Sequence, residues 1–237
     1  MRKGLPHVSI NVAMTADGKL APANRQFTPF TTKRDQDFML ELRAAFDAVM
    51  SGARTVDTGE VTLGSGGERY RKKRRARGLK EEHIRVIVSG DGTLDPKAHI
   101  FTSKKTTSPI IILTTKRAGK RLPALQRAAD AVHVSKGKDL DFNEAFRWLR
   151  KEWGVKRLLC EGGGAINGGL FLAGVVNELY LTIAPVILGG RNSPTMADGA
   201  GFQKLADAQQ LKLKRLQRIG DELYTVFSVP RRSEAQG

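Results

Sequence analysis

The chain has 237 residues, of which 40% are hydrophobic and 27% are charged. This length and composition support a folded core and exclude a disordered or collagen-like chain. No apolar run reaches the roughly 18 residues that a membrane-spanning helix requires, and the best stretch, Gly169–Leu188, is interrupted by polar residues and a proline. Cys160 is the single cysteine, which excludes an internal disulfide and a thiolate zinc cage within one chain. We therefore expect a cytoplasmic protein without membrane contact.

The charge of the chain is strongly basic and unevenly distributed. Forty Lys and Arg stand against 24 Asp and Glu, which gives a formal net charge of +16. Residues 69–80 (RYRKKRRARGLK), the basic run, carry eight basic and no acidic side chains, so half of the excess lies there. Two interpretations remain open at this point: a solvated basic loop or helix, and a surface for a phosphate-rich ligand, small or polymeric.

The N-terminal half alternates between strand and helix patterns. Val8–Met14 predicts a strand, and Thr32–Ala45 predicts an amphipathic helix with Thr32 as its N-cap. Phe38, Met39 and Leu42 share one face of that helix. The next predicted strands are Phe46–Ser51, Arg85–Ser89 and Ile110–Thr114.

The C-terminal half continues the alternation and ends in a ribbon. In chain order we expect a helix around Ala118–Ala129, a strand at Ala131–Val134, a helix at Asp141–Trp153, a strand at Arg157–Glu161, a helix that ends at Leu172 and a strand at Glu178–Ala184. Leu211–Arg218 and Glu222–Val229 form a two-stranded ribbon that turns at Gly220-Asp221.

This alternation predicts an α/β fold. We expect a mainly parallel central sheet with helices on both faces and an antiparallel ribbon at the C-terminal end. No linker divides the sequence, so residues 1–237 are interpreted as one domain with its core at about residues 7–229. Residues 62–80 are an irregular, basic insertion, and residues 231–237 are a frayed tail.

The most specific candidate site is the sequence LLCEGGGAINGG at residues 158–169. A buried strand ends at Glu161, glycines turn the chain, and a helix begins. Free N–H groups at a helix N-terminus attract phosphate, and glycines let a pyrophosphate approach the backbone. A tight strand-to-helix turn without a ligand explains the same pattern, so both interpretations stay open.

Other charged groups also follow strands or helices. The carboxylate of Glu161 needs a partner at the end of an apolar strand, and a heterocycle with adjacent N–H groups would provide one. Arg43, at the end of the first helix, suits either the helix dipole or a phosphate clamp. In GARTV (52–56), Arg54 and Thr55 offer a second phosphate or ribose contact. The four histidines are isolated, so no metal site is expected.

Four blocks in order give these residues a family context: VAMTADGKLA (12–21), LRAAFDAVMSGARTV (42–56), VIVSGDGTLDPKAHIF (86–101) and EGGGAINGGLFLAGVVNELYLTIAPVILGG (161–190). Together they resemble the RibD C-terminal family, the reductase domain of riboflavin biosynthesis, which has a dihydrofolate-reductase-like fold. The resemblance implies an NADPH-dependent reductase that converts 5-amino-6-(5-phosphoribosylamino)uracil, or a closely related phosphoribosylaminopyrimidine, to its ribityl form by hydride transfer to C1′.

The resemblance also implies roles for individual residues. By this resemblance, Glu161, Arg43 and Asn11 are expected to contact the substrate. Met14 and Phe27 match positions that flank the nicotinamide, Thr55 and Ser89 match cofactor contacts, and Ser89 with Arg54 are candidates for the adenosine 2′-phosphate. The pyrophosphate and its ribose are expected along Gly163, Gly164, Ala165, Ile166, Asn167, Gly168 and Gly169. No side chain is identified as the proton donor, and a homodimer without the deaminase domain is expected.

Two departures from the family pattern leave the substrate open. The family often has Lys where this chain has Asn11, and its Asp-Pro-x-Leu-Thr-x-Arg stretch is replaced by DTGEVTLGSGGERYR (57–71). Arg69 or Arg71 could substitute for the missing arginine. An NADPH-dependent reductase of another heterocycle, a pterin or a flavin, is the alternative. A nucleic-acid-binding protein using the basic run is a third possibility, disfavoured because Tyr70 is the sole aromatic there.

Overall fold

A computed structural model describes residues 3–25, 29–57, 61–103 and 107–231. The chain forms two compact units. The first unit consists of Met1–Pro6 and Met39–Leu159, and the second of His7–Phe38 and Cys160–Gly237. Two elements begin in one unit and end in the other: α1 (Lys33–Arg43) and β6 (Arg157–Cys160). Each unit is described by itself.

The first unit is built on strands in the order β5-β4-β3-β2-β6. Neighbours from β2 to β5 pair in parallel, namely β2 (Ala48–Gly52), β3 (Ile84–Val88), β4 (Ile110–Thr115) and β5 (Ala131–Ser135). Isoleucine, valine and leucine predominate in the inner strands β3 and β4, because inner parallel strands are covered on both faces. Phe46, Ile87, Ile112, Leu125 and Leu159 belong to one buried cluster, which holds the carboxyl ends of the strands in a fixed register.

The helices of the first unit are short, apart from α6. They are α2 (Ala53–Asp57), α3 (Glu68–Ala76), α4 (His99–Thr102), a 3-10 helix (Lys116–Arg121), α5 (Leu122–Ala128) and α6 (Phe142–Trp153). The Asp141 carboxylate accepts the N–H groups of Asn143 and Glu144 and caps α6. Gly154, with φ 68°, ends this helix in the left-handed region. The expected helix is confirmed together with both of its ends.

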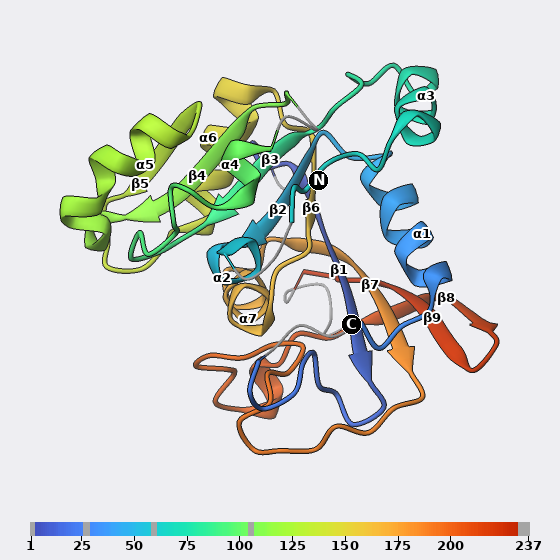
Figure 1. The fold of residues 1–237 in the computed structure, drawn as a ribbon. Coiled ribbons are helices and arrows are strands. Elements are labelled where there is room, and N and C mark those ends of the chain that lie inside the picture. Colours follow the sequence, from blue (N-terminus) through green and yellow to red (C-terminus); the bar gives the residue numbers. More distant parts are fainter. Residues whose placement is uncertain (1–2, 26–28, 58–60, 104–106, 232–237) are drawn as a thin grey trace. The chain divides into compact units, whose positions relative to one another are not determined.

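The second unit contains β1 (His7–Thr15), which pairs in parallel with β7 (Val176–Ala184). Figure 1 shows β1 in blue and β7 in orange side by side. Strand β9 (Glu222–Ser228) is antiparallel to β7, and β8 (Lys212–Ile219) is antiparallel to β9. Helix α7 (Gly164–Leu172) and a 3-10 turn (Leu205–Asp207) complete the unit. The expected ribbon with its turn at Gly220-Asp221 is therefore confirmed.

Three segments differ from the sequence expectations. The helix expected around Ala118–Ala129 is two pieces, because Gly119 (φ 49°, ψ −124°) breaks the helical backbone. The insertion at residues 62–80 is not irregular throughout, since it contains α3. Helix α4 was not anticipated. None of the helices in the described ranges is long and apolar enough to cross a membrane. The expected tail at residues 231–237 lies outside the described residues apart from Arg231.

Candidate active site

The glycine-rich turn lies in the second unit, between the end of β6 and the start of α7. Gly163 is the N-cap of α7 and has an extended backbone (φ −79°, ψ 177°). The Cys160 side chain just before the turn is fully buried, and this burial raises the pKa of its thiol to about 12. The strand–turn–helix expected from the sequence is confirmed, and the cysteine beside it is a neutral core residue rather than a nucleophile.

Two glycines of this turn are required by packing within the chain. A side chain at Gly164 would collide with the carbonyl oxygen of Thr195 and with the carboxylate of Asp198. A side chain at Gly168 would collide with the carbonyl oxygen of Asp198. The Asp198 N–H donates to the Gly164 carbonyl at 2.9 Å. These contacts place the loop 195–198 directly on α7, which explains why small residues recur at this spacing.

The beginning of α7 remains open to a ligand. A Cβ at Gly163 would meet no atom within 4 Å. Within the described part of the chain, the first-turn N–H groups of Gly164 and Ala165 take no hydrogen-bond partner. Free N–H groups and the helix dipole together favour an anion at this end of the helix. The residues present therefore fit a diphosphate group that approaches along Gly163.

Asn167 is used inside the chain. Its side chain is fully buried, its Nδ2 donates to the carbonyl of Met196 at 3.0 Å, and its Oδ1 accepts a weak bond from the Cys160 thiol at 3.7 Å. The Ile166 side chain packs beside Gly162, where a Cβ would lie 3.0 Å away. Asn167 therefore links β6, α7 and the loop 195–198, and this positions the backbone around the open N–H groups.

Asn11 and Met14 lie on β1 in the second unit, and both are half-buried. Asn11 pairs with Tyr180 and Met14 pairs with Ile183 in the register of β7. Because side chains alternate along a strand, Asn11 and Met14 point to opposite faces of this sheet. Phe27 is the other expected nicotinamide neighbour and lies outside the described residues.

The turn that follows β1 is fastened by Asp17. Its carboxylate accepts the Thr15 hydroxyl at 2.5 Å and the N–H groups of Leu188 and Gly189 at 3.2 and 2.7 Å. These bonds, the Thr15 bond foremost, lower the pKa of Asp17 to about 2. Gly18 has φ 80°, which favours glycine. The chain turns at Asp17-Gly18, and the Asp17 carboxylate holds this turn to the loop at Leu188 and Gly189.

Arg43 lies in the first unit at the end of α1. It is buried, and its Nη1 donates to the carbonyl of Gly64 at 2.8 Å. The neighbouring carbonyl of Leu63 is 2.6 Å from Nε2 of His83. A carbonyl can only accept, so His83 carries its proton on Nε2. Arg43 and His83 thus fix the loop 62–65, and His83 is a residue of this region that the sequence did not single out.

His83 is neutral. It is buried to 1% exposure, and burial together with the positive charge of Arg43 lowers its pKa to about 3. Its Nδ1 has no hydrogen-bond partner in the described part of the chain. A histidine in this state is not a proton donor at neutral pH.

Arg54, Thr55 and Ser89 follow the carboxyl ends of neighbouring strands. Arg54 and Thr55 are exposed on α2, directly after β2, and Ser89 is the first residue after β3. Since β2 and β3 are parallel neighbours, these residues share one edge of the sheet, where α/β proteins bind ligands. The Ser89 side chain is buried, and its Oγ accepts the N–H of Leu94 at 3.3 Å.

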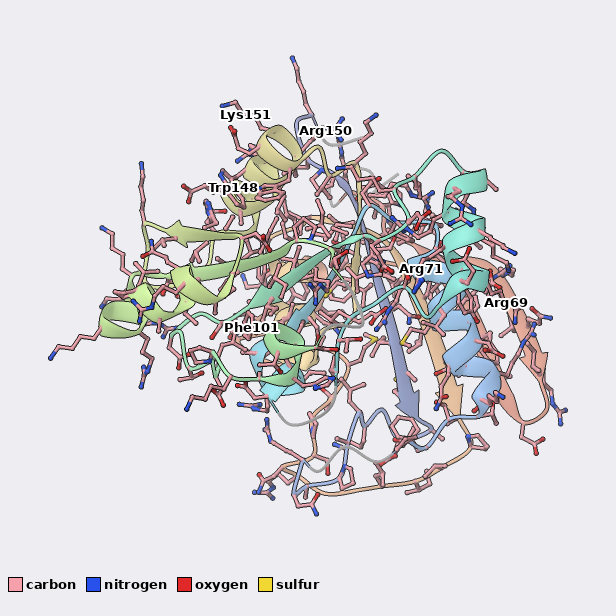
Figure 2. All side chains as sticks on the ribbon, turned by 45° about the horizontal axis from the view of Figure 1, so that its top comes forward. Arg69, Arg71, Phe101, Trp148, Arg150 and Lys151 are labelled. Carbon is pink, nitrogen blue, oxygen red and sulfur yellow. The ribbon has the colours of Figure 1, made fainter. Side chains whose placement is uncertain are left out.

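Four of the eight cations of the basic run pair with acids of the same unit. Arg69 and Arg71 belong to α3, and Figure 2 labels their side chains on this helix. Arg71 pairs with Glu82 at 3.0 Å and Arg69 with Glu41 at 3.5 Å. Lys73 also pairs with Glu41, Arg71 with Glu68, and Arg75 with both Glu68 and Glu81. Arg69 and Arg71, the candidate replacements for the missing family arginine, are thus engaged in ion pairs that fasten α3.

Two carboxylates of the second unit, those of Glu222 and Asp35, were not predicted as site residues. Glu222 accepts hydrogen bonds from Thr32 and Tyr224, and Asp35 accepts one from the Thr182 hydroxyl at 2.7 Å. They are 187 residues apart in the chain, so no local pattern links them. Within the described ranges, no group of His, Cys, Asp and Glu could hold a metal ion.

Comparison with known proteins gives this geometry its context. The sequence model of the RibD C-terminal domain family matches residues 6–225. A 2,5-diamino-6-ribosylamino-4(3H)-pyrimidinone 5′-phosphate reductase of Methanothermobacter thermautotrophicus is 30% identical over 224 residues, which cover 94% of this chain and 98% of that protein. The reductase of the same name from Aquifex aeolicus is 31% identical over 229 residues, which cover 94% and 96%.

The fold has solved counterparts as well. A pyrimidine reductase-like protein of Corynebacterium diphtheriae superposes with a TM-score of 0.77 at 21% identity, over 95% of this chain and 92% of that one. This likeness confirms the expected mixed α/β fold with a mainly parallel sheet and antiparallel C-terminal strands. From the match over residues 6–225 and the two reductases matched over nearly their whole length, the chain belongs to the RibD C-terminal domain family.

Proposed function

We propose that this protein is the riboflavin-pathway reductase that converts the ribosyl group of a phosphorylated ribosylaminopyrimidine to a ribityl group. The observation that carries the proposal is the match over nearly full length to two reductases named for 2,5-diamino-6-ribosylamino-4(3H)-pyrimidinone 5′-phosphate. Enzymes of this family are oxidoreductases. Both the diaminopyrimidinone and the aminouracil form are ribosylamine phosphates, so the same reduction at C1′ applies to each.

NADPH is the proposed cofactor. A bound nicotinamide dinucleotide supplies a hydride, which is the reducing equivalent that the ribosyl carbon needs. The N-terminal end of α7, with Gly163 and Ala165 exposed and Gly164 behind them, would hold its diphosphate. Arg54, Thr55 and Ser89 would contact the adenosine ribose and its 2′-phosphate, and Met14 and Phe27 would flank the nicotinamide. The remaining α7 residues Ile166, Asn167, Gly168 and Gly169 would support this seat from within the helix.

Arg43, Glu161 and Asn11 are the proposed substrate contacts. Arg43 would clamp the 5′-phosphate, and its bond to Gly64 would hold the loop 62–65 in place beside that phosphate. A planar guanidinium suits phosphate better than a lysine does, because its donors are fixed in a fork. Glu161 follows a buried strand and would orient the pyrimidine by accepting its N–H groups. Asn11 would contact the same substrate from β1.

The test is a direct assay of the purified protein with both pyrimidine phosphates. Oxidation of NADPH, followed by absorbance, is expected with at least one of them and with NADH only at a much lower kcat/KM. Arg43→Lys keeps the charge but loses the fork, so it should raise KM for the phosphorylated substrate. Absence of turnover with both pyrimidine phosphates would refute the assignment.

A second candidate function is reduction of a pterin or a flavin by the same cofactor. It is favoured by one observation: the sequence that replaces the family's Asp-Pro-x-Leu-Thr-x-Arg stretch forms a loop held by Arg43 and His83. NADPH oxidation with a pterin or flavin, but not with the pyrimidine phosphates, would establish it.

The ion pairs of α3 neutralise part of the basic run, which disfavours nucleic-acid binding. A cytoplasmic homodimer is part of the proposal, and sedimentation analysis checks the dimer.

A further inference from the structure

Two carboxyl groups lie where α1 begins: that of Glu222, which is buried, and that of Asp35, which is half-buried. Glu222 of β9 is only 3% exposed. Its carboxylate accepts the N–H and the hydroxyl of Thr32 and the hydroxyl of Tyr224, each at 2.7 Å. These bonds stabilise the ionised form and lower the pKa of Glu222 in spite of its burial. Glu222 is therefore a fixed negative charge at the N-terminal end of α1.

Asp35 lies on the same helix, three residues after Thr32. Its Oδ1 accepts the hydroxyl of Thr182 from β7 at 2.7 Å. Burial raises the pKa of Asp35, the negative charge of Glu222 raises it further, and hydrogen bonds from Thr182 and Thr31 oppose the shift. Two carboxyls whose surroundings push their pKa values apart are typical of a site that holds a proton on one of them.

The groups that face Asp35 come from three elements. Strand β7 provides the Thr182 hydroxyl, strand β9 provides Glu222 and the phenol of Tyr224, and the start of α1 provides Thr31 and Thr32. Among these groups the single full charge is that of Glu222, because desolvation and the hydrogen bond to Glu222 raise the pKa of Tyr224 and its phenol stays neutral. The charge that reaches Asp35 is negative.

This carboxyl shares a face of the sheet with a proposed substrate contact. Thr182 pairs with Ala13 and Tyr180 pairs with Asn11, so these four side chains point to one side of β1 and β7. Phe38 of α1 packs against Tyr180 and Tyr224 on that side, with ring centroids 6.2 and 5.6 Å apart. Helix α1 thus packs on the β7 and β9 part of this face, and the Asp35 carboxyl reaches the face through Thr182.

We propose that Asp35 is the proton donor of the reduction. The inference rests on the proposed function. Reduction of the ring-opened imine of the substrate forms a C–H bond at C1′ with the hydride and breaks the C=N π bond, whose electron pair goes to nitrogen. That nitrogen takes the proton from the Asp35 carboxyl, and the resulting carboxylate regains a proton from water. Glu222 acts as a positioning residue, because its negative charge disfavours the ionised form of Asp35.

Three variants test the proposal through the pH profile. Asp35→Asn should lower kcat about a hundredfold, the size of a lost general acid, with little change in KM. In the wild type, kcat/KM should fall as pH rises through the pKa of Asp35. Glu222→Gln removes the negative charge and should move this fall to lower pH. Thr182→Val removes a bond that favours the carboxylate and should move it to higher pH. Asp37→Asn, which removes a carboxylate two residues away, is the matched control.

A second readout does not depend on turnover. Carbon-13 NMR of the aspartate carboxyls, with Asp35→Asn to assign the signal, should show Asp35 titrating above the ordinary aspartate value in the resting enzyme. An Asp35→Asn variant with wild-type kcat, equal shifts from Glu222→Gln and Thr182→Val, or an Asp35 signal that titrates at or below the ordinary value would each overturn the proposal. Failure of the wild type to reduce either pyrimidine phosphate would instead refute the proposed function, and the inference with it.

Discussion

The carbonyl oxygen of Asp198 occupies the space that a side chain at Gly168 would need. This relationship separates two reasons for glycine in the sequence EGGGAINGG. Gly164 and Gly168 let the loop 195–198 pack on α7, whereas Gly163 faces open space at the helix N-terminus. One motif thus combines glycines required for packing with a proposed anion-binding site, and the two can be tested separately.

Gly168→Ala should destabilise the protein. The added methyl group meets a main-chain oxygen, so either α7 or the loop 195–198 must move, and overpacking of this kind costs about 1–3 kcal/mol. Urea unfolding measures the loss. Gly163→Ala is the control, and its free energy of unfolding should change by less than about 1 kcal/mol. Equal losses in the two variants would contradict the packing argument.

His83 should make the protein sensitive to mild acid. Its pKa is about 3 in the folded chain, mainly through burial, against about 6.5 when exposed. Between these values the unfolded chain binds a proton that the folded chain does not, so stability falls as pH falls. The contribution approaches about 1.4 kcal/mol per pH unit within that window.

The measurement is the free energy of unfolding at neutral pH and at about pH 5, in the wild type and in His83→Gln. The variant should lose this part of the pH dependence. His99→Gln serves as the control and should keep it, since His99 lies outside the loop that Arg43 and His83 fix. A His83→Gln protein with an unchanged slope would show that another group is responsible.

The sequence predicted elements best where local signals agreed. Helix α6 has an Asp141 cap, an apolar face and a terminal Gly154, and each of these can be read from neighbouring residues. The C-terminal ribbon has its turn at Gly220-Asp221 for the same reason. Residues of the glycine-rich turn were found because a strand, three glycines and a helix follow one another directly.

Features that depend on distant residues were missed. Helix α3 has no apolar stripe, because its central buried side chain is Arg74. The pairing of β7 with β9 brings Glu222 within electrostatic range of Asp35, and Gly168 meets Asp198 through a loop that returns to α7. Sequence patterns depend on residues that are close together in the chain, whereas these contacts join residues that are far apart in it.

Arg74 should be essential for the first unit, unlike the other cations of the basic run. It is 1% exposed, and its guanidinium donates to the carbonyls of Lys80, Arg43 and Phe46 at 2.6–2.8 Å. Arg74→Met keeps much of the volume but leaves these acceptors without a donor, at a cost of about 2–5 kcal/mol. Thermal and urea unfolding measure it. Lys72→Met, an exposed change on the same helix, should cost less than about 0.5 kcal/mol.

Glu178 should stabilise the second unit above acidic pH. Its carboxylate is bonded to His7 at 3.3 Å, Lys214 at 2.8 Å and Tyr180 at 3.1 Å. These bonds, the one with His7 foremost, lower the pKa of Glu178 to about 2. The stabilisation is therefore complete above the ordinary glutamate value and is lost as pH falls from there toward about 2. Glu178→Gln should lower the free energy of unfolding by about 1–3 kcal/mol at neutral pH and by almost nothing at the acid end of this window.

The control is Glu152→Gln, which removes an exposed carboxylate paired with Lys151. It should change the free energy of unfolding by less than about 1 kcal/mol at either pH. A loss from Glu178→Gln that stays constant with pH would show that packing, and not the ionised carboxylate, holds β1, β7 and β8 at this point.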